Sequence, residues 1–307
     1  MDELPLISAV ELSRFYGHFC AVDALSFEVK RGQVVGFLGT NGAGKTTTMQ
    51  MLTGNLAPTS GQIRLAGFDL LDSPLAAKSQ LGYLPEHPPL YPECRVDEYL
   101  RFCARLHGLS KTETHQAVDE VLNTCGLTGV YRRLIANLSK GYQQRVGIAQ
   151  AIVHSPSVVV LDEPTVGLDP VQSHSVRELI QKLGQQRAVI VSTHLLNEVQ
   201  SICTHVQILQ AGRCVLQGAL RDLLHQPVTT LTLGLHHAPS LARLKILPNV
   251  QQVESITPNK WRLHCSPGQL PTDAIVQAAA AERWGLFELT PEYRTLEQLF
   301  IELTQLS

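Results

Sequence analysis

Residues 39–46 have the residue types and the spacing of a phosphate-binding loop. Four residues separate Gly39 from Gly44, and Lys45 and Thr46 follow directly. Glycines let the backbone curl so that N–H groups point at phosphate oxygens, and a following helix adds the positive end of its dipole. We expect Lys45 to contact the β and γ phosphates, Thr46 to bind Mg²⁺ and Thr47 to donate to a phosphate. The residues expected to hold the phosphates are Gly39, Asn41, Gly42, Ala43, Gly44, Lys45, Thr46 and Thr47.

Two acids, Asp162 and Glu163, follow a hydrophobic run at residues 158–161. This pattern is typical of the carboxyl end of a buried parallel strand that faces a ligand cleft. Asp162 can hold Mg²⁺ directly or through water, and Glu163 can accept the proton of the water that attacks the γ-phosphate. A strand that merely ends in two solvated acids would look the same. The catalytic interpretation therefore depends on the phosphate loop in the same chain.

These groups need a sheet whose strands end at one edge. Hydrophobic runs at 34–38, 157–161 and 188–192 predict strands buried on both faces, with helices between them. Residues 6–30 alternate apolar and polar, which predicts a pair of strands with one apolar face. From about residue 96 to 125 the period becomes 3.6, and two helices follow each other there. The sequence predicts an α/β core with a helical insertion.

The pattern changes after residue 226. Short alternating strands at 230–233 and 261–264, with helices near 271–283 and 295–306, suit a small ferredoxin-like sandwich followed by a last helix. Single cores rarely grow far beyond about 250 residues, so 307 residues favour two units. We expect one domain over 1–226, with a helical subdomain at about 87–150, and a small α+β domain over 227–307.

Composition excludes several classes of protein. With 44% apolar and 17% charged residues the chain is an ordinary globular protein, and a net charge of −2 gives no basic field for nucleic acid or acidic lipid. The seven scattered cysteines form no C-x-x-C pair and are expected to be reduced. We see no secretory signal and no apolar run of the roughly 18 to 20 residues that span a bilayer, so we expect a cytoplasmic protein.

Residues 138–145 read Leu-Ser-Lys-Gly-Tyr-Gln-Gln-Arg and resemble the signature motif of the ABC ATPase family. That family usually has Leu-Ser-Gly-Gly-Gln-Gln, so Lys140 replaces a glycine and a tyrosine is added before the first glutamine. A serine hydroxyl and a glycine N–H at a helix start form a second anion site, although an ordinary helix N-cap reads the same without the family. The resemblance implies that Ser139, Gly141 and Gln143 bind nucleotide.

Other landmarks of the ABC ATPase family follow in order over residues 6–220. By this resemblance, Tyr16 stacks on adenine. Residues 167–169 match the D-loop, with Asp169 at the nucleotide. His194 matches the switch histidine, which contacts the γ-phosphate and holds the attacking water in place.

Glu86 departs from the family pattern, which usually has Gln after Gly-Tyr-Leu-Pro. A carboxylate can still ligate Mg²⁺, but it places negative charge close to the triphosphate and to Glu163. We expect Glu86 to keep the metal role and to raise the dependence on Mg²⁺.

The resemblance implies a P-loop (RecA-like) ABC ATPase core with an antiparallel β subdomain and an α-helical subdomain. It implies the ATP-hydrolysing subunit of an ABC transporter, with ATP and Mg²⁺ as cofactors. Two such subunits, identical or paired with another ATPase, close head to tail around two ATP. Through the helical insertion and residues 86–95 they drive a separate permease from the cytoplasmic face of the membrane.

Two short segments indicate the direction of transport. Residues 83–91 and 295–300 resemble a subgroup that serves gliding-motility and multidrug-type exporters, which favours export. The alternative is a soluble ABC ATPase acting on ribosomes or DNA. Such proteins carry two cassettes with basic linkers or a cassette split by a long heptad coil, and this sequence shows neither pattern. It also shows no basic stripe for nucleic acid.

Overall fold

The structure is a computed structural model that describes residues 4–224, 229–237, 239–292 and 295–305. Contacts within the chain divide it into two units, Met1–Leu220 and Arg221–Ser307. The boundary expected at residues 226 and 227 lies outside the described residues. No helix within the described ranges has both the length and the apolar character needed to cross a bilayer.

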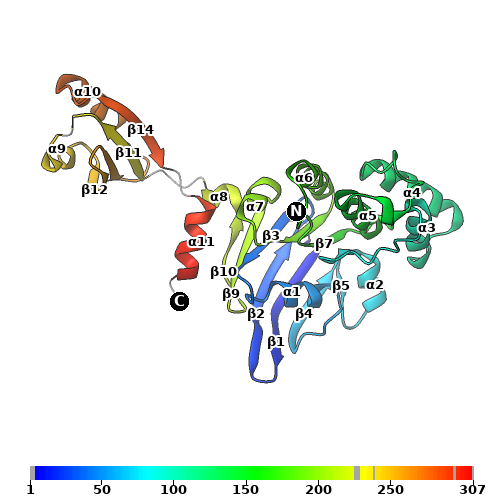
Figure 1. Cartoon of the computed structure of the whole chain (residues 1–307). Coiled ribbons are helices and arrows are strands. Elements are labelled where there is room, and N and C mark those ends of the chain that lie inside the picture. The colour runs from blue at the N-terminus through cyan, green and yellow to red at the C-terminus, as the bar shows by residue number, and fades with distance from the viewer. Residues whose placement is uncertain (1–3, 225–228, 238, 293–294, 306–307) are drawn as a thin grey trace. The chain divides into compact units, whose positions relative to one another are not determined.

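A six-stranded sheet forms the centre of the first unit, in the order β10-β9-β3-β8-β7-β6 (Figure 1). Neighbouring strands from β9 to β6 run parallel, and β10 is antiparallel to β9 at the edge. The expected buried strands are present as β3, β7 and β8. The strands are β3 (Val34–Gly39), β6 (Leu81–Leu84), β7 (Val158–Asp162), β8 (Ala188–Ser192), β9 (His205–Gln210) and β10 (Arg213–Ala219).

Alternate side chains of the central strands enter two hydrophobic clusters. Val159 and Leu161 of β7 pack into the cluster that contains the helical insertion. Val158 and Val160 pack into the other cluster, with α1 (Lys45–Leu52) and the antiparallel sheet. Because both faces of β7 are covered, the strand is hydrophobic at every position until Asp162, where the sheet ends.

The antiparallel sheet has the order β2-β1-β4-β5 and covers the α1 side of the core. It contains the strand pair expected over residues 6–30, which meets at a tight turn after Tyr16. Its strands are β1 (Ile7–Tyr16), β2 (Phe19–Val29), β4 (Ser60–Leu65) and β5 (Phe68–Asp69). The sheet positions Tyr16 at the end of β1.

Helices fill the rest of the first unit. The second helix of the insertion, α4, begins with the expected capping box, in which Glu113 N donates to Ser110 Oγ at 3.3 Å and Ser110 N donates to the Glu113 carboxylate at 2.8 Å. The helices are α2 (Pro74–Ser79), α3 (Val96–Leu106), α4 (Lys111–Thr124), the 3₁₀ turn η1 (Ile135–Asn137), α5 (Lys140–Ile152), α6 (Pro170–Gly184) and α7 (Leu196–Ile202).

All residues of α8 (Leu220–Leu224) after Leu220 belong to the second unit, which contains a four-stranded antiparallel sheet in the order β12-β13-β11-β14. The order of its elements after α8 is β-α-β-β-α-β plus a last helix. These elements are β11 (Thr230–Leu235), α9 (Leu241–Lys245), β12 (Val250–Thr257), β13 (Lys260–Cys265), α10 (Thr272–Ala281), β14 (Leu286–Glu292) and α11 (Leu296–Gln305). The hydrophobic side of this sheet packs with Trp261 and Trp284 in a core of its own.

Candidate functional site

A cavity of about 420 Å³ lies where β3 and β7 end. Most of the residues that the sequence predicted for the site line this cavity. They come from distant parts of the chain, since Tyr16 and His194 are 178 positions apart. The predicted residues that line it are Tyr16, Asn41, Gly42, Ala43, Gly44, Lys45, Thr46, Thr47, Glu86, Asp162, Glu163 and His194. Phe19, Ala21, Val166 and Ser192 also line it and were not predicted.

A larger hollow of about 580 Å³ lies on the other side of the core, near the amino-terminal ends of β3 and β9. None of the predicted site residues lines it. The cavity of about 420 Å³ is therefore the candidate site, because the predicted residues line it.

The loop before α1 requires glycine at two positions, because other segments of the backbone pack closely against it. Gly44 has a φ of +98°, and a Cβ added there would lie 2.6 Å from the carbonyl oxygen of Ala21. A Cβ on Gly39 would lie 2.6 Å from the carbonyl oxygen of Leu209. α1 starts at Lys45 with no side-chain cap and no acid in its first turn. Its first N–H groups are therefore free to donate to an anion.

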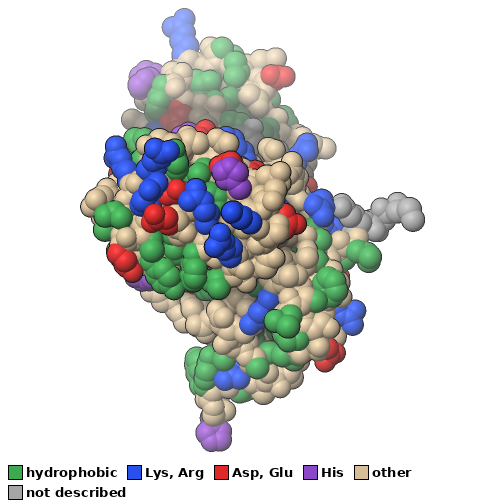
Figure 2. Space-filling model, turned by 90° about the vertical axis from the view of Figure 1, so that its right-hand side faces the viewer, with side chains coloured by type: hydrophobic (Ala, Val, Ile, Leu, Met, Phe, Trp, Pro, Cys, Tyr) green, Lys and Arg blue, Asp and Glu red, His purple; other side chains and the backbone are tan. Residues whose placement is uncertain are grey.

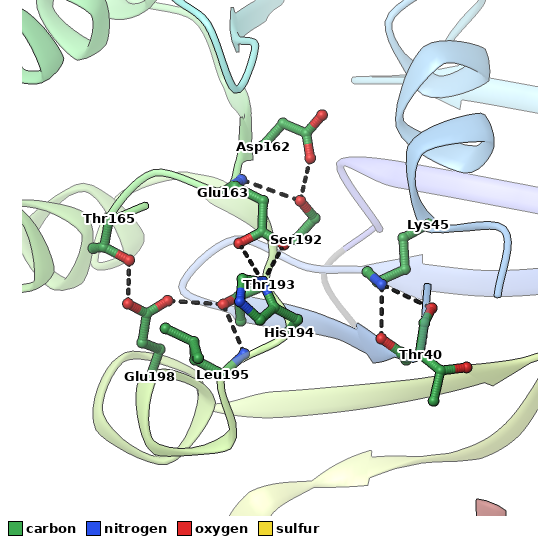
Figure 3. A network of polar contacts seen from close by, with 11 residues as sticks. Thr40, Lys45, Asp162, Glu163, Thr165, Ser192, Thr193, His194, Leu195 and Glu198 are labelled. Carbon is green, nitrogen blue, oxygen red and sulfur yellow. Dashed lines mark hydrogen bonds and ion pairs between the residues drawn. The ribbon is translucent and has the colours of Figure 1, made fainter. Parts of the chain in front are cut away.

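Lys45 is buried beside this loop. Its ammonium donates to the carbonyl oxygens of Gly39 at 2.7 Å and Thr40 at 3.1 Å (Figure 3). Burial lowers the pKa of Lys45 below its usual value, and the carboxylates of Glu163 and Asp162 oppose this shift. The side chain thus presents a desolvated positive charge, which interacts strongly with phosphate.

Asp162 and Glu163 are held by the neighbouring strand β8. Ser192 Oγ donates to the Asp162 carboxylate, and the backbone N–H of Glu163 donates to Ser192 Oγ at 3.2 Å. Burial raises the pKa of Asp162; the Ser192 hydrogen bond opposes this shift, and the Glu86 carboxylate adds to it. Asp162, Glu163 and the exposed Glu86 line the same cavity, an arrangement of carboxylates that a divalent cation would stabilise.

His194 and Glu163 lie within hydrogen-bonding distance, with His194 Nδ1 2.9 Å from Glu163 Oε1 (Figure 3). Burial raises the pKa of Glu163 above its usual value, and the contact with His194 opposes this shift. Glu163 also has a φ of +47°, in the left-handed region. A residue other than glycine is seldom found there, and such strain is common at functional sites.

The sequence pattern did not indicate Glu198, which lies on α7 and is only 5% exposed. Its carboxylate accepts from Thr165 Oγ1, and from Thr193 Oγ1 at 2.8 Å. Thr165 follows Glu163 in the chain, and Thr193 precedes His194. Glu198 therefore ties together the two turns that carry the Glu163–His194 pair.

Other predicted residues do not line the cavity. Gly39 lies behind it, where its carbonyl oxygen accepts from Lys45. Ser139 is the N-cap residue of α5, and Asp169 caps α6 by accepting from Gln172 N at 2.8 Å. Gln143 Nε2 donates to the carbonyl oxygens of residues 135 and 138, at 3.1 and 3.3 Å.

Gly141 is also outside the cavity, beside Gln172 at the start of α6. The signature segment and the D-loop thus lie next to each other but away from this chain's own phosphate loop.

Comparisons with known proteins show which proteins this chain resembles. Residues 22–166 match the family model described as ABC transporter. The chain is 39% identical over 226 residues to "Uncharacterized ABC transporter ATP-binding protein YxlF" of Bacillus subtilis (strain 168), covering 74% of this chain and 75% of the relative. It is 29% identical over 306 residues to "Linearmycin resistance ATP-binding protein LnrL" of the same organism, covering 97% and 98%.

A solved structure, "Structure of cbiO1 from clostridium perfringens: Part of the ABC transporter complex cbiONQ", superimposes with a TM-score of 0.66 at 30% identity. The match covers 72% of this chain and 91% of that one. The expected P-loop α/β fold is confirmed.

Proposed function

This chain belongs to the ABC transporter family as an ATP-binding subunit, and on that premise we propose how its residues use ATP. It is an ATPase subunit that drives a membrane transporter, and its partner is a membrane permease. The observation that carries the proposal is the convergence of the phosphate loop, the acids after β7 and His194 on one cavity. A soluble role on ribosomes or DNA is not favoured.

In our proposal the phosphates lie in the loop of residues 39–47, against Lys45 and the first turn of α1. Adenine stacks on Tyr16, which is 46% exposed at the cavity. The Arg14 guanidinium lies 4.8 Å from the centre of the Tyr16 ring and occupies one face of it. The other face is left for the base.

Thr46, Asp162 and Glu86 would hold Mg²⁺, because their oxygens line the same cavity and are the hard donors that this ion prefers. When bound, Mg²⁺ neutralises charge on the β and γ phosphate oxygens. Glu163 accepts the proton of the attacking water, and a raised pKa makes its carboxylate a better base. His194 orients that carboxylate and contacts the γ-phosphate.

Ser139, Gly141, Gln143 and Asp169 serve a second subunit in this proposal. They lie outside the cavity that contains Lys45, so they cannot surround a nucleotide bound there without a rearrangement. Two chains closing head to tail would place this group over the partner's phosphate loop. Closure would exclude water from two ATP, and hydrolysis would reopen the pair.

The permease is proposed to dock on the helical insertion and residues 86–95. Tyr91 is 46% exposed and Phe102 of α3 is 44% exposed, with their ring centroids 5.8 Å apart. Figure 2 views the side on which α3 and α4 lie in Figure 1, and hydrophobic side chains gather there beside Lys and Arg side chains. We propose export as the direction, because residues 83–91 resemble the exporter subgroup and a full-length relative carries "resistance" in its name.

The test is a mild-detergent pull-down of the Glu163→Gln protein from its native membranes, with and without ATP. A polytopic membrane protein retained in stoichiometric amount is expected. It would also show that the subunit associates with the membrane through that partner. Recovery of ribosomes or DNA-bound proteins, with no membrane partner, would contradict the transport role.

Glu86→Gln is expected to weaken the binding of Mg²⁺, because it removes the charge of one of the three carboxylates in the cavity. The half-saturating free Mg²⁺ concentration for ATPase activity should rise by roughly three- to tenfold. Glu93→Gln is the control, since Glu93 is an exposed acid further along the same segment. An unchanged Mg²⁺ titration for Glu86→Gln would remove Glu86 from the metal site.

A further inference from the structure

Two helices of the first unit begin with the same dipeptide but differ in how their first turns are satisfied. α4 begins with Ser110 and Lys111, and α5 with Ser139 and Lys140. The Ser110 hydroxyl caps α4, and Glu113 adds an acid to its first turn. Ser139 makes no side-chain cap, and the first turn of α5 contains no acid.

The position of Lys140 at the start of α5 is therefore electrostatically unfavourable. A cation near a helix N-terminus opposes the helix dipole, and in α4 the Glu113 carboxylate offsets that repulsion for Lys111. Lys140 has no such compensation. It is exposed, and within the ranges that the structure describes its ammonium makes no ion pair or hydrogen bond. The start of α5 thus combines free N–H groups with an uncompensated positive charge.

The ammonium of Lys140 lies over the D-loop. A Cβ added to Gly167 would be 2.1 Å from Lys140 Nζ, and Gly167 itself has a φ of +69°. A Cβ added to Gly141 would be 2.4 Å from Gln172 Oε1, so the same helix start also packs on the start of α6. These distances place the lysine beside the group of residues that, in the proposed pair, faces the other subunit's nucleotide.

We propose that Lys140 contributes a positive charge to the triphosphate held by the second subunit, in addition to that subunit's own Lys45. This inference rests on the proposed two-subunit site. The usual signature has glycine at this position and can offer only an N–H group. A lysine adds a full charge, which is strongest when closure excludes water. ATP-driven pairing in this protein therefore depends on charge at the signature segment.

The test measures ATP-dependent pairing of the full chain in the Glu163→Gln background by sedimentation velocity, over a range of Mg-ATP and salt concentrations. Lys140→Met keeps the length and removes the charge, and Lys140→Arg keeps the charge. Lys111→Met is the matched control on the capped helix. Lys140→Met should raise the ATP concentration for half-maximal pairing roughly tenfold and flatten its salt dependence, whereas Lys140→Arg and Lys111→Met should resemble the parent.

Two results would overturn the inference. If Lys140→Met pairs like the parent, the lysine only packs over Gly167. If the Glu163→Gln parent itself stays monomeric in Mg-ATP, the two-subunit site fails and Lys140 loses its role with it; the parent thus tells the two failures apart. Because Lys140 opposes the helix dipole, Lys140→Met should not lower the thermal midpoint, which excludes misfolding as the cause of weaker pairing.

Discussion

Glu163→Gln is expected to lower the rate of ATP hydrolysis by about 10² to 10⁴-fold, the usual contribution of a general base, while ATP still binds. The amide keeps the size of the side chain but cannot accept the proton of water. Neutralising a buried carboxylate beside Asp162 also removes repulsion from the triphosphate, so affinity for ATP should not fall. Steady-state hydrolysis and equilibrium ATP binding would be measured on the same preparation.

The same variant should accumulate as a pair of subunits in Mg-ATP, since hydrolysis is the step proposed to reopen them. A monomeric elution profile under these conditions would count against that cycle. Glu178→Gln is a suitable control, because Glu178 is an exposed acid on α6 whose only described ion pair is with His174. It should hydrolyse ATP at the parent rate.

Sequence alone located the part of the site that is contiguous in the chain. Residues 39–47 form one strand end, one loop and one helix start, so their spacing already determines which groups can face a phosphate. Asp162 and Glu163 were found for a similar reason, since the hydrophobic run of a fully buried strand stops where the strand reaches the edge of the sheet. The sheet order then brings these two segments together, because parallel strands end at the same edge.

Glu198 could not be found in this way, because its role comes from burial and not from spacing. It lies on a short helix, and its two partners are 33 and five positions away in the chain. An acid on a helix is usually exposed, so nothing in its type distinguished it. Ser192 was missed for a related reason: its hydroxyl acts on Asp162 only because β8 pairs with β7.

In the second unit, the sequence pattern predicts the positions of the strands less precisely. β13 alternates between buried and partly exposed residues, and the sequence located it at 261–264. β12 lies at an edge of the sheet and contains no fully buried residue, so its sequence carries no period of two. The order of elements was still predictable from the neighbouring strands and helices. The position of the edge strand follows only from its pairing with β13.

Gly44→Ala is expected to weaken ATP binding by at least about a hundredfold. The substitution forces an L side chain to a φ of +98° and places its Cβ 2.6 Å from the backbone oxygen of Ala21. Strain of this kind costs about 1–3 kcal/mol by itself, and a backbone carbonyl cannot rotate away as a side chain would. A free-energy cost of about 1.4 kcal/mol lowers affinity tenfold. The backbone strain and the close contact with Ala21 together displace the loop, and their combined cost accounts for the expected loss of ATP affinity.

Gly108→Ala distinguishes the effect of backbone strain alone from the effect of displacing the phosphate loop. Gly108 has a similar φ of +83°, but no atom lies within 4 Å of an added Cβ, and it follows α3 far from the cavity in the chain. It should lower the thermal midpoint through backbone strain and leave ATP affinity unchanged. Binding of a fluorescent ATP analogue to both variants decides the matter: parent-like affinity in Gly44→Ala would mean that the triphosphate does not lie in this loop, whatever the motif suggests.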